Sequence, residues 1–384
     1  MGELRPGWRR VKFAQLAECV NDRVDDPSKS GVDRYVGLDH LDPESLTIRR
    51  WGAPDEVEST KLRFKPGDII FGKRRAYQRK LAVADFEGIC SAHAMVLRAK
   101  PAAVLPEFLP FFMQSDTFME RAVAISVGSL SPTINWKTLA VQEFALPPLE
   151  EQRRVAKALQ LLDLASSAAR TSRDAALVAR DAGIGQQMRM TSPGDATLGD
   201  LCSVITDGEH ATPPRTSAGV YLLSARNIQD DGLDLSNVDY VSPDTFATLA
   251  RRIAPRWGDV LISCSGSIGR VCPAPRNLSF ALVRSVALLR PVPESLNHEF
   301  LVVCLQSPRG QQQIRALTNQ TAQGNLFQGA IRRIKIPMLP LRSQLGIVDT
   351  WKVGSSTIAA VNARIAQLAV LRQRLLGESV GEEK

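Results

Sequence analysis

The sequence has few cysteines, and no two of them lie close together. Zinc ribbons and redox motifs place two cysteines two residues apart, so their absence predicts buried free thiols and no metal site. The six are Cys19, Cys90, Cys202, Cys264, Cys272 and Cys304. No apolar run approaches the roughly 18 residues of a membrane helix, and the N-terminal residues lack the apolar core of a signal peptide. We therefore expect an unexported cytoplasmic protein without a membrane partner.

The motifs of common enzyme classes are also missing. The sequence has no Asn-Pro-Pro-aromatic motif of an amino-group methyltransferase, no Gly-Lys-Ser/Thr phosphate loop and no His-Glu-x-x-His metal helix. An acidic stretch at 54–58 lacks the spaced acid and lysine of a nuclease. We expect no catalytic residue in this chain.

What is present is typical of a globular protein. The 384 residues are 44% hydrophobic and 23% charged, which suits two domains with ordinary cores. The net charge of +8 is compatible with a polyanionic partner but is too mild to identify one.

One segment of the sequence occurs twice. A Pro-Leu-x-x-Gln segment at 148–152 recurs at 340–344, a shift of 344 − 152 = 192 positions in a chain of 384. The same shift maps Glu-Phe-Leu at 107–109 onto 299–301, and Gln-Ser at 114–115 onto 306–307. Eight identities at one offset indicate an internal duplication.

Each copy begins with a module of mixed pattern. The apolar runs 68–71 and 259–262 each begin at the Asp of a Gly-Asp turn, which predicts a buried strand. Segments 106–124 and 297–317 have helical apolar spacing. We predict two similar α+β domains over residues 1–146 and 193–338, each followed by a long helix over 147–192 and 339–384.

Both long helices have a heptad-like seam. In the first helix, steps of three and four give mostly small residues: Val155, Ala158, Leu162, Ala165, Ala169, Ser172, Ala176 and Ala179. In the second helix the same rhythm gives Ile358, Val361, Ile365, Leu368, Arg372 and Leu375. We predict that the two helices pack as an antiparallel coiled coil with a pseudo-two-fold internal repeat, and that they hold the modules apart as a molecular ruler.

The two helix starts differ. Glu150 and Glu151 follow two prolines at the first start, where carboxylates face the positive end of the helix dipole. The second copy has Arg342 and Ser343 there, and a Gly-Ser-Ser segment at 354–356. We expect its first turns to be weak or kinked, with a well-formed helix only from about Thr357.

Three segments could bind a polyanion. The first is a run of five cations in eight residues after the first predicted strand, with Tyr77 and Gln78 among Lys73, Arg74, Arg75, Arg79 and Lys80. Cations neutralise phosphates, Arg and Gln read base edges, and Tyr stacks on bases. A solvated basic loop is the plain alternative.

The other two segments lie in the second copy. A Ser-Gly-rich stretch contains Ser265, Ser267 and Arg270, and small residues allow close approach to a phosphate or base, although a plain turn explains these residue types better. A loop at 206–214 contains His210 and Thr212 and is followed by Arg215. Because no third spaced ligand accompanies its Asp, Glu and His, a polar binding loop fits it better than a metal or acid-base site.

Together these features resemble the specificity (S) subunit of Type I restriction-modification systems. The resemblance lies in segments 144–155, 207–213, 258–269 and 6–8, and extends over essentially the full chain. It implies that each module is a target recognition domain for one half of a bipartite double-stranded DNA target, contacted through the three segments above. The paired helices would set the gap between the halves.

The resemblance also implies partners. Two methylation (M) subunits per chain would bind along the helices and carry S-adenosylmethionine, and restriction (R) subunits would bring ATP- and Mg-dependent endonuclease activity. This chain would be a non-catalytic subunit that binds none of those cofactors. The alternative is a duplicated protein-interaction scaffold without sequence-specific DNA binding.

Overall fold

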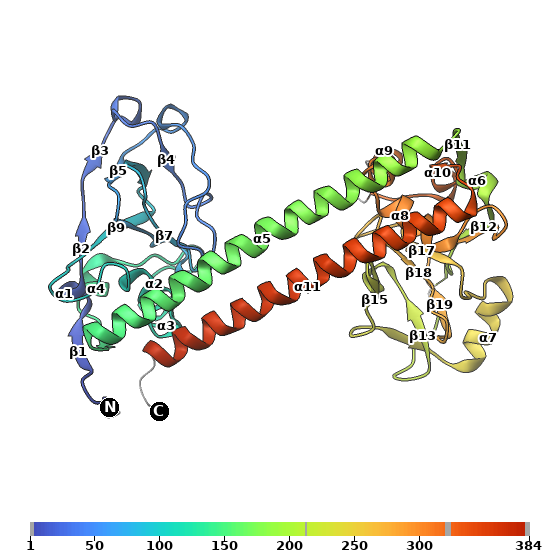
Figure 1. The fold of residues 1–384 in the computed structure, drawn as a ribbon. Helices are drawn as coiled ribbons and strands as arrows, with labels where there is room; N and C mark the ends of the chain where they lie inside the picture. The colour runs from blue at the N-terminus through green and yellow to red at the C-terminus, as the bar shows by residue number, and fades with distance from the viewer. Residues whose placement is uncertain (1–3, 212, 319–323, 381–384) are drawn as a thin grey trace. The chain divides into compact units, whose positions relative to one another are not determined.

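A computed structural model of the chain describes residues 4–211, 213–318 and 324–380. The chain divides into two units, residues 1–170 with 363–384 and residues 171–362. Each unit contains one module and a part of both long helices, α5 (Leu149–Thr191) and α11 (Leu341–Val380) (Figure 1). Within the described ranges, no helix is long and apolar enough to cross a membrane.

The module of the first unit contains two four-stranded sheets. One has the order β2-β9-β6-β7, formed by Ala17–Val20, Ala94–Ala99, Ile69–Gly72 and Leu81–Val83. The other has the order β3-β5-β8-β4, formed by Arg23–Val24, Lys61–Phe64, Gly88–Ser91 and Tyr35–Val36. An antiparallel pair joins β1 (Arg9–Lys12) to β10 (Glu143–Leu146). The helices are α1 (Phe13–Leu16), α2 (Leu109–Gln114), α3 (Asp116–Ala124) and α4 (Trp136–Ala140), with short 3-10 helices η1 (Pro27–Lys29), η2 (Pro54–Glu56) and η3 (Ala76–Gln78).

The module of the second unit repeats the first four-stranded sheet. Its order is β12-β20-β17-β18, formed by Cys202–Asp207, Val286–Pro291, Val260–Ser263 and Val271–Pro273. The pair β11 (Asp195–Thr197) and β21 (Lys335–Pro337) is again antiparallel. The remaining strands are β13 (Val220–Leu223), β14 (Ile228–Gln229), β15 (Gly232–Leu233), β16 (Asp239–Val241) and β19 (Phe280–Leu282). The helices are α6 (Leu198–Leu201), η4 (Ala225–Asn227), α7 (Pro243–Arg252), α8 (His298–Gln306), α9 (Pro308–Leu317) and α10 (Gln328–Arg332).

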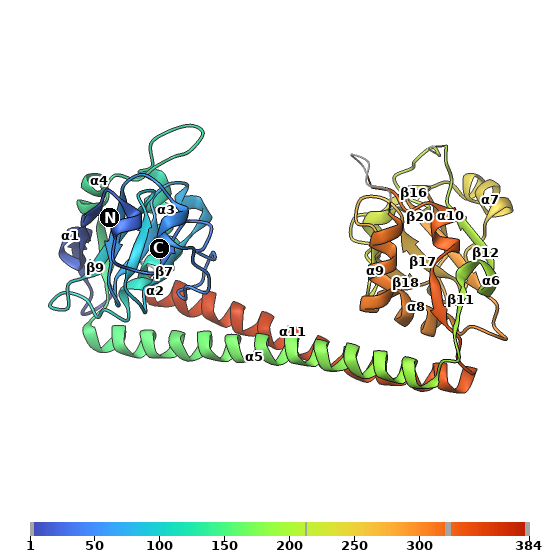
Figure 2. The ribbon, with the colours of Figure 1, turned by 90° about the horizontal axis from the view of Figure 1, so that it is seen from above.

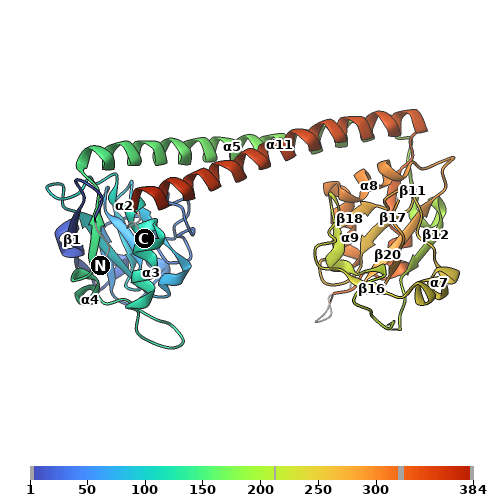
Figure 3. The same cartoon turned by 90° about the horizontal axis from the view of Figure 1, so that it is seen from below.

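The two predicted buried strands are confirmed as β6 and β17. In β6, Ile69 and Phe71 face the main core of the first module, whereas Ile70 faces a second core between the sheets. In β17, Leu261 likewise enters a different core from its neighbours Val260 and Ile262. Each strand is buried at every position, and its first three residues are all apolar because both of its faces are buried. In the second unit α8 and α9 lie beside the sheet of β17 and β18 (Figure 3).

Each predicted helix around the Gln-Ser pair is in fact two helices. Ser115 has an extended backbone that separates α2 from α3, and its hydroxyl accepts from Phe118 N at 3.3 Å while donating to Phe112 O at 2.6 Å. Ser307 separates α8 from α9 in the same way, with Gly310 N at 3.1 Å. A serine that caps a helix satisfies an orphan amide there, which apolar spacing alone does not reveal.

The glutamine that recurs at 152 and 344 has the same structural role in both copies. Gln152 is fully buried, and its side chain accepts from Leu105 N at 2.9 Å and donates to Pro147 O at 2.8 Å. Gln344 makes the equivalent bonds, accepting from Asn297 N at 2.8 Å and donating to Leu339 O at 2.8 Å. In both units the glutamine ties the first turn of the long helix to the loop before the first helix of the pair.

Parts of α5 and α11 pack against one another in each unit. In the first unit Val155, Leu159 and Leu376 share the module core, and Arg372 pairs with Asp163 at 2.8 Å. In the second unit the residues Ile184, Met188, Ile347, Val348 and Trp351 join the core. The early part of α5 meets the late part of α11, and the reverse, so the predicted antiparallel pairing is confirmed. With the repeated domain, this confirms the predicted fold class.

The predicted seam of α11 is confirmed, but that of α5 is partly wrong. Ala165, Ser172 and Ala179 are exposed, whereas the buried or half-buried positions include Leu159, Ser166, Arg173 and Arg180. Arg180 lies over the Trp351 ring at 3.7 Å, and only 13% of its side chain is exposed. The heptad analysis favoured small residues and missed that arginine buries its apolar stem along a helix seam.

The expected kink in the second helix is also wrong. α11 is one continuous helix through Gly354, Ser355 and Ser356. A Cβ on Gly354 would lie 2.8 Å from Arg180 Cγ, and Arg180 also donates to Ser355 Oγ at 3.2 Å. The small residues admit the arginine of the other helix, and this packing outweighs their low helix propensity.

Candidate functional site

The basic run 73–80 leaves the end of β6 in a tight turn. Arg75 and Arg79 both have positive φ, 57° and 53°, on either side of η3. Tyr77 between them is 54% exposed and Arg75 is exposed, while Lys73, Arg74 and Gln78 are half-buried. This turn presents Tyr77 and Arg75 to solvent while its other side chains pack against the module.

Several cations of this run have partners inside the module. Arg79 pairs with Asp116 at 2.7 Å, and Lys80 donates to Leu38 O at 2.7 Å. Arg74 Nη2 lies 3.2 Å from Ser131 Oγ, and its Nη1 lies 3.3 Å from His93 Nε2. Arg79 and Lys80 therefore fix the shape of the turn. Arg74 and Arg75 lie on its outer side, where Arg74 contacts His93 and both arginines contact Ser131.

His93 is a neighbour that the sequence did not single out. Burial, together with the cations of Arg74, Lys73 and Lys61, lowers the pKa of His93. A histidine with a lowered pKa stays neutral at pH 7, and here burial contributes more to the shift than any one of the three nearby cations does. The signal was absent from the sequence because His93 reaches Arg74 only through strand pairing.

In the second unit, residues 263–270 form the equivalent turn after β17. Arg270 N bonds to Ser263 Oγ at 3.0 Å, and Arg270 Nη1 donates to Gln229 Oε1 at 2.6 Å. Ser265 is half-buried and forms a bridge with Asn325, while Ser267 is exposed. Gly269 has φ 88°, and a Cβ there would lie 3.1 Å from Ile314, which restricts the position to glycine.

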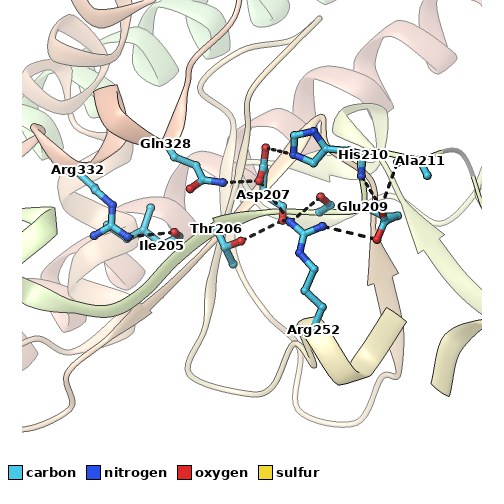
Figure 4. A network of polar contacts seen from close by, with 10 residues as sticks. Ile205, Thr206, Asp207, Glu209, His210, Ala211, Arg252, Gln328 and Arg332 are labelled. Carbon is cyan, nitrogen blue, oxygen red and sulfur yellow. Dashed lines mark hydrogen bonds and ion pairs between the residues drawn. The ribbon is translucent and has the colours of Figure 1, made fainter. Parts of the chain in front are cut away.

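The loop after β12 is held by a dense polar network (Figure 4). His210 Nε2 lies 2.9 Å from Asp207 Oδ2, and Gln328 donates to the other oxygen of the same carboxylate. Glu209 Oε1 accepts from the backbone amides of His210 at 2.9 Å and Ala211 at 3.1 Å. His210 remains 63% exposed, so the loop is internally bonded while its imidazole faces solvent.

Arg252 anchors this loop from the end of α7. Its guanidinium lies 3.7 Å from Asp207 and 3.6 Å from Glu209, and it donates to Asp207 O at 3.1 Å. The hydrogen bond from Ala211, with that from His210 and the charge of Arg252, lowers the pKa of Glu209. The carboxylate therefore stays ionised as an acceptor.

One predicted residue, Arg215, pairs outside this network. Arg215 is 56% exposed and lies 3.5 Å from Asp239. Thr212 lies outside the described residues. The loop is organised by four side chains: Asp207, Glu209, Arg252 and Gln328. Only Asp207 and Glu209 lie near His210 in sequence, so the sequence alone did not indicate the other two.

Among the described residues, no three His, Cys, Asp or Glu side chains gather as metal ligands would. Burial raises the pKa of the Cys90, Cys202, Cys264 and Cys272 thiols to about 12. Such thiols are protonated at neutral pH and are poor nucleophiles. Both sites instead present exposed side chains on well-bonded turns.

The sequence also matches a known family model, described as the Type I restriction modification DNA specificity domain, over residues 54–174 and 196–369. The chain belongs to this family. It is 32% identical over 162 residues to the specificity subunit of the Type I restriction enzyme EcoDI from Escherichia coli. That alignment covers 40% of this chain and 34% of the relative, so the chain spans about a third of that protein.

Two solved structures show that the specificity-family fold extends over the whole chain. One, from work on complex assembly and conformational transition of the type I R-M system, has a TM-score of 0.60 at 22% identity and covers 98% of both chains. The Type I restriction-modification S subunit of M. genitalium has a TM-score of 0.61 at 14% identity, covering 100% of this chain and 98% of its own. These low identities show the fold alone.

In this specificity-family chain the two turns occupy equivalent scaffold positions. Ile134 N bonds to Lys73 O at 2.9 Å in the first unit, and Leu326 N bonds to Cys264 O at 2.9 Å in the second. Arg74 bridges to Thr133, as Ser265 does to Asn325. The same scaffold thus carries a cationic turn in one copy and a Ser-Gly turn in the other.

Proposed function

We propose that this chain is the non-catalytic, sequence-specific DNA-binding subunit of a Type I restriction-modification complex. Each module would read one half of a bipartite double-stranded DNA target through its turn after β6 or β17. The observation that carries this proposal is the duplicated scaffold with unlike turns at equivalent positions. A cationic turn in one module and a Ser-Gly turn in the other would suit two half-sites of different sequence.

Residues of both turns, and residues 210–215 after β12 in the second module, would contact DNA. In the first module these are Lys73, Arg74, Arg75, Tyr77, Gln78, Arg79 and Lys80. In the second they are His210, Thr212, Arg215, Ser265, Ser267 and Arg270. Arg75, Tyr77, His210 and Ser267 are exposed and suit direct contact, whereas Arg79 and Lys80 suit a supporting role because they pair inside the module.

The long helices would position partner subunits. In the first unit a groove between α5 and α11 is lined by Leu161, Leu371 and nine other residues, and these two leucines are 58% and 51% exposed. Leu164 nearby is 66% exposed. A row of exposed leucines suits a protein partner. Two methylation subunits, which would carry S-adenosylmethionine, and restriction subunits, which would use ATP and Mg, are the proposed partners of this cytoplasmic chain.

The test is to map the methylated adenines of the genome. Deleting the gene in a strain that methylates a two-part adenine motif should erase that motif. Exchanging residues 1–145 for those of a relative should change only one half of the motif. An unchanged methylome after deletion would contradict the proposal.

The alternative function is a protein-interaction scaffold, favoured only by the exposed leucines of the helices. Salt separates the two functions. Phosphate-driven binding weakens by about 0.9 log units per log unit of salt for each phosphate neutralised, whereas an apolar protein interface changes little. A salt-insensitive complex with a protein partner, together with no sequence-specific binding of DNA, would favour the scaffold.

A further inference from the structure

The segment between α3 and α4 projects from the first module (Figures 2 and 3). Leu130 is 90% exposed and Val127 is 79% exposed. Single exposed apolar residues are common on protein surfaces, but two on one projecting loop form a small patch that would gain from being covered.

The loop has a defined shape at its base. Val127 and Thr133 exchange two backbone hydrogen bonds of 3.1 and 2.9 Å. Ile134 N then bonds to Lys73 O at 2.9 Å. The loop is therefore closed like a hairpin and joined to the first residue of the basic run.

Two arginines brace the same loop near its tip. Arg75 N donates to Pro132 O at 2.7 Å. The Arg74 and Arg75 guanidinium groups both donate to Ser131 Oγ, at 3.2 and 3.3 Å. The residue next to Leu130 in sequence is thus bonded to two cations, which places an apolar side chain beside two groups that bind phosphate.

DNA is the macromolecule that combines these two chemistries most directly. Its phosphates attract Arg74 and Arg75, and an apolar side chain that enters a base step replaces base stacking there. A protein partner that covered Leu130 would also have to neutralise the two guanidinium groups that are bonded to Ser131. Resting on the proposed function, we propose that Leu130 is an apolar wedge inserted at one base step of the half-site read by the first module.

The test uses the complete complex of the chain with its methylation subunits. DNA carrying 2-aminopurine in place of one adenine of the half-site at a time, on either strand, reports unstacking as a rise in fluorescence. Wild type should give that rise at one step. Leu130→Ser should abolish it and weaken specific binding roughly ten-fold or more, since the burial of a leucine is lost. Leu130→Met should restore both because methionine also serves as a wedge.

Two measurements keep the outcomes separate. Leu130 is almost fully exposed, so its replacement should leave the thermal unfolding of the chain and its affinity for non-specific DNA unchanged. Specific binding without a fluorescence rise at any step would overturn the wedge. A Leu130→Ser variant that loses the methylation subunits but keeps its DNA preference would overturn it in favour of a protein interface. If wild type itself showed no DNA preference, the proposed function would fail instead.

Discussion

Replacing Asp259 by Asn should destabilise the second module by leaving a cation without its partner. Asp259 is fully buried, and its carboxylate accepts from Arg290 Nε at 2.7 Å and Nη2 at 2.8 Å. It also accepts from Arg256 N at 2.8 Å. The bond to Asp259 raises the pKa of Arg290, so the guanidinium stays charged when the carboxylate is removed.

The size of the effect follows from the burial of both partners. Breaking a buried ion pair by removing one partner costs about 3–5 kcal/mol. Arg290 keeps 21% of its side-chain exposure and a bond to Ala254 O at 3.0 Å, which favours the lower end of that range. A loss of about 3 kcal/mol lowers the Tm of a domain of this size by roughly 6–12 °C.

The duplication supplies a matched control, Asp68→Asn. Asp68 is also buried, and it binds Arg98 at 2.7 and 2.9 Å through the same two nitrogens. However, 43% of the Arg98 side chain is exposed, so water would solvate the unpaired charge. The expected cost is about 1 kcal/mol, in the range of a surface pair.

Calorimetry of the two full-length variants measures both values. The Asp259→Asn variant should also lose recognition of one half of the methylated motif at a temperature where the Asp68→Asn variant retains both. Equal Tm shifts in the two variants, or no shift in either, would refute the reasoning that exposure of the arginine decides the cost.

Two further predictions concern buried groups. Burial raises the pKa of four thiols to about 12, and a raised pKa adds stability that is complete below the unfolded value of about 9 and is lost as pH rises towards 12. Above pH 9, each thiol should lower the free energy of unfolding by up to about 1.4 kcal/mol per pH unit. A urea midpoint that stays constant from pH 8 to 11 would contradict this prediction. Gly208→Ala should disturb the His210 loop because the new Cβ would lie 2.2 Å from Leu282 O. Its methylome should lose one half-site while the other is read normally.

The duplicated frame could be predicted because its signals are local. The strands β6 and β17 follow Gly-Asp turns and each begin with three apolar residues, and the glutamines of the long helices lie 192 positions apart. These features are visible without knowing which segments meet in space. The fold class was confirmed for that reason.

The details that could not be predicted depend on distant neighbours. The seam of α5 was misplaced because the burial of Arg180 requires Trp351 and Gly354, which lie on the other helix. His93 and Leu130 join the basic run only through strand pairing and backbone bonds to residues 73–75. Arg75 and Arg79 have the same residue type, but Arg75 is exposed whereas Arg79 is half-buried and paired with Asp116, so their expected roles differ.

The residues that recur in both copies have buried polar groups, whereas the two turns that differ between the copies carry exposed side chains. This difference decides which residues can be replaced without loss of the fold. Ser115 and Ser307, like the two glutamines, satisfy buried backbone groups in both units. A change there would leave an unmet hydrogen bond. The turns after β6 and β17 carry exposed side chains and are free to differ.

Exchanging only these turns should nevertheless fail to transfer specificity. The turn 73–80 depends on Asp116 for Arg79 and on Leu38 O for Lys80, and the turn 263–270 depends on Gln229 for Arg270. A turn moved alone would leave these partners behind and lose its shape. We therefore expect a chimera with residues 73–80 in place of 264–270 to methylate neither half-site combination. Exchange of whole modules should yield a new combined motif. A turn-only chimera that reads the transplanted half-site would show that the exposed side chains suffice without their internal partners.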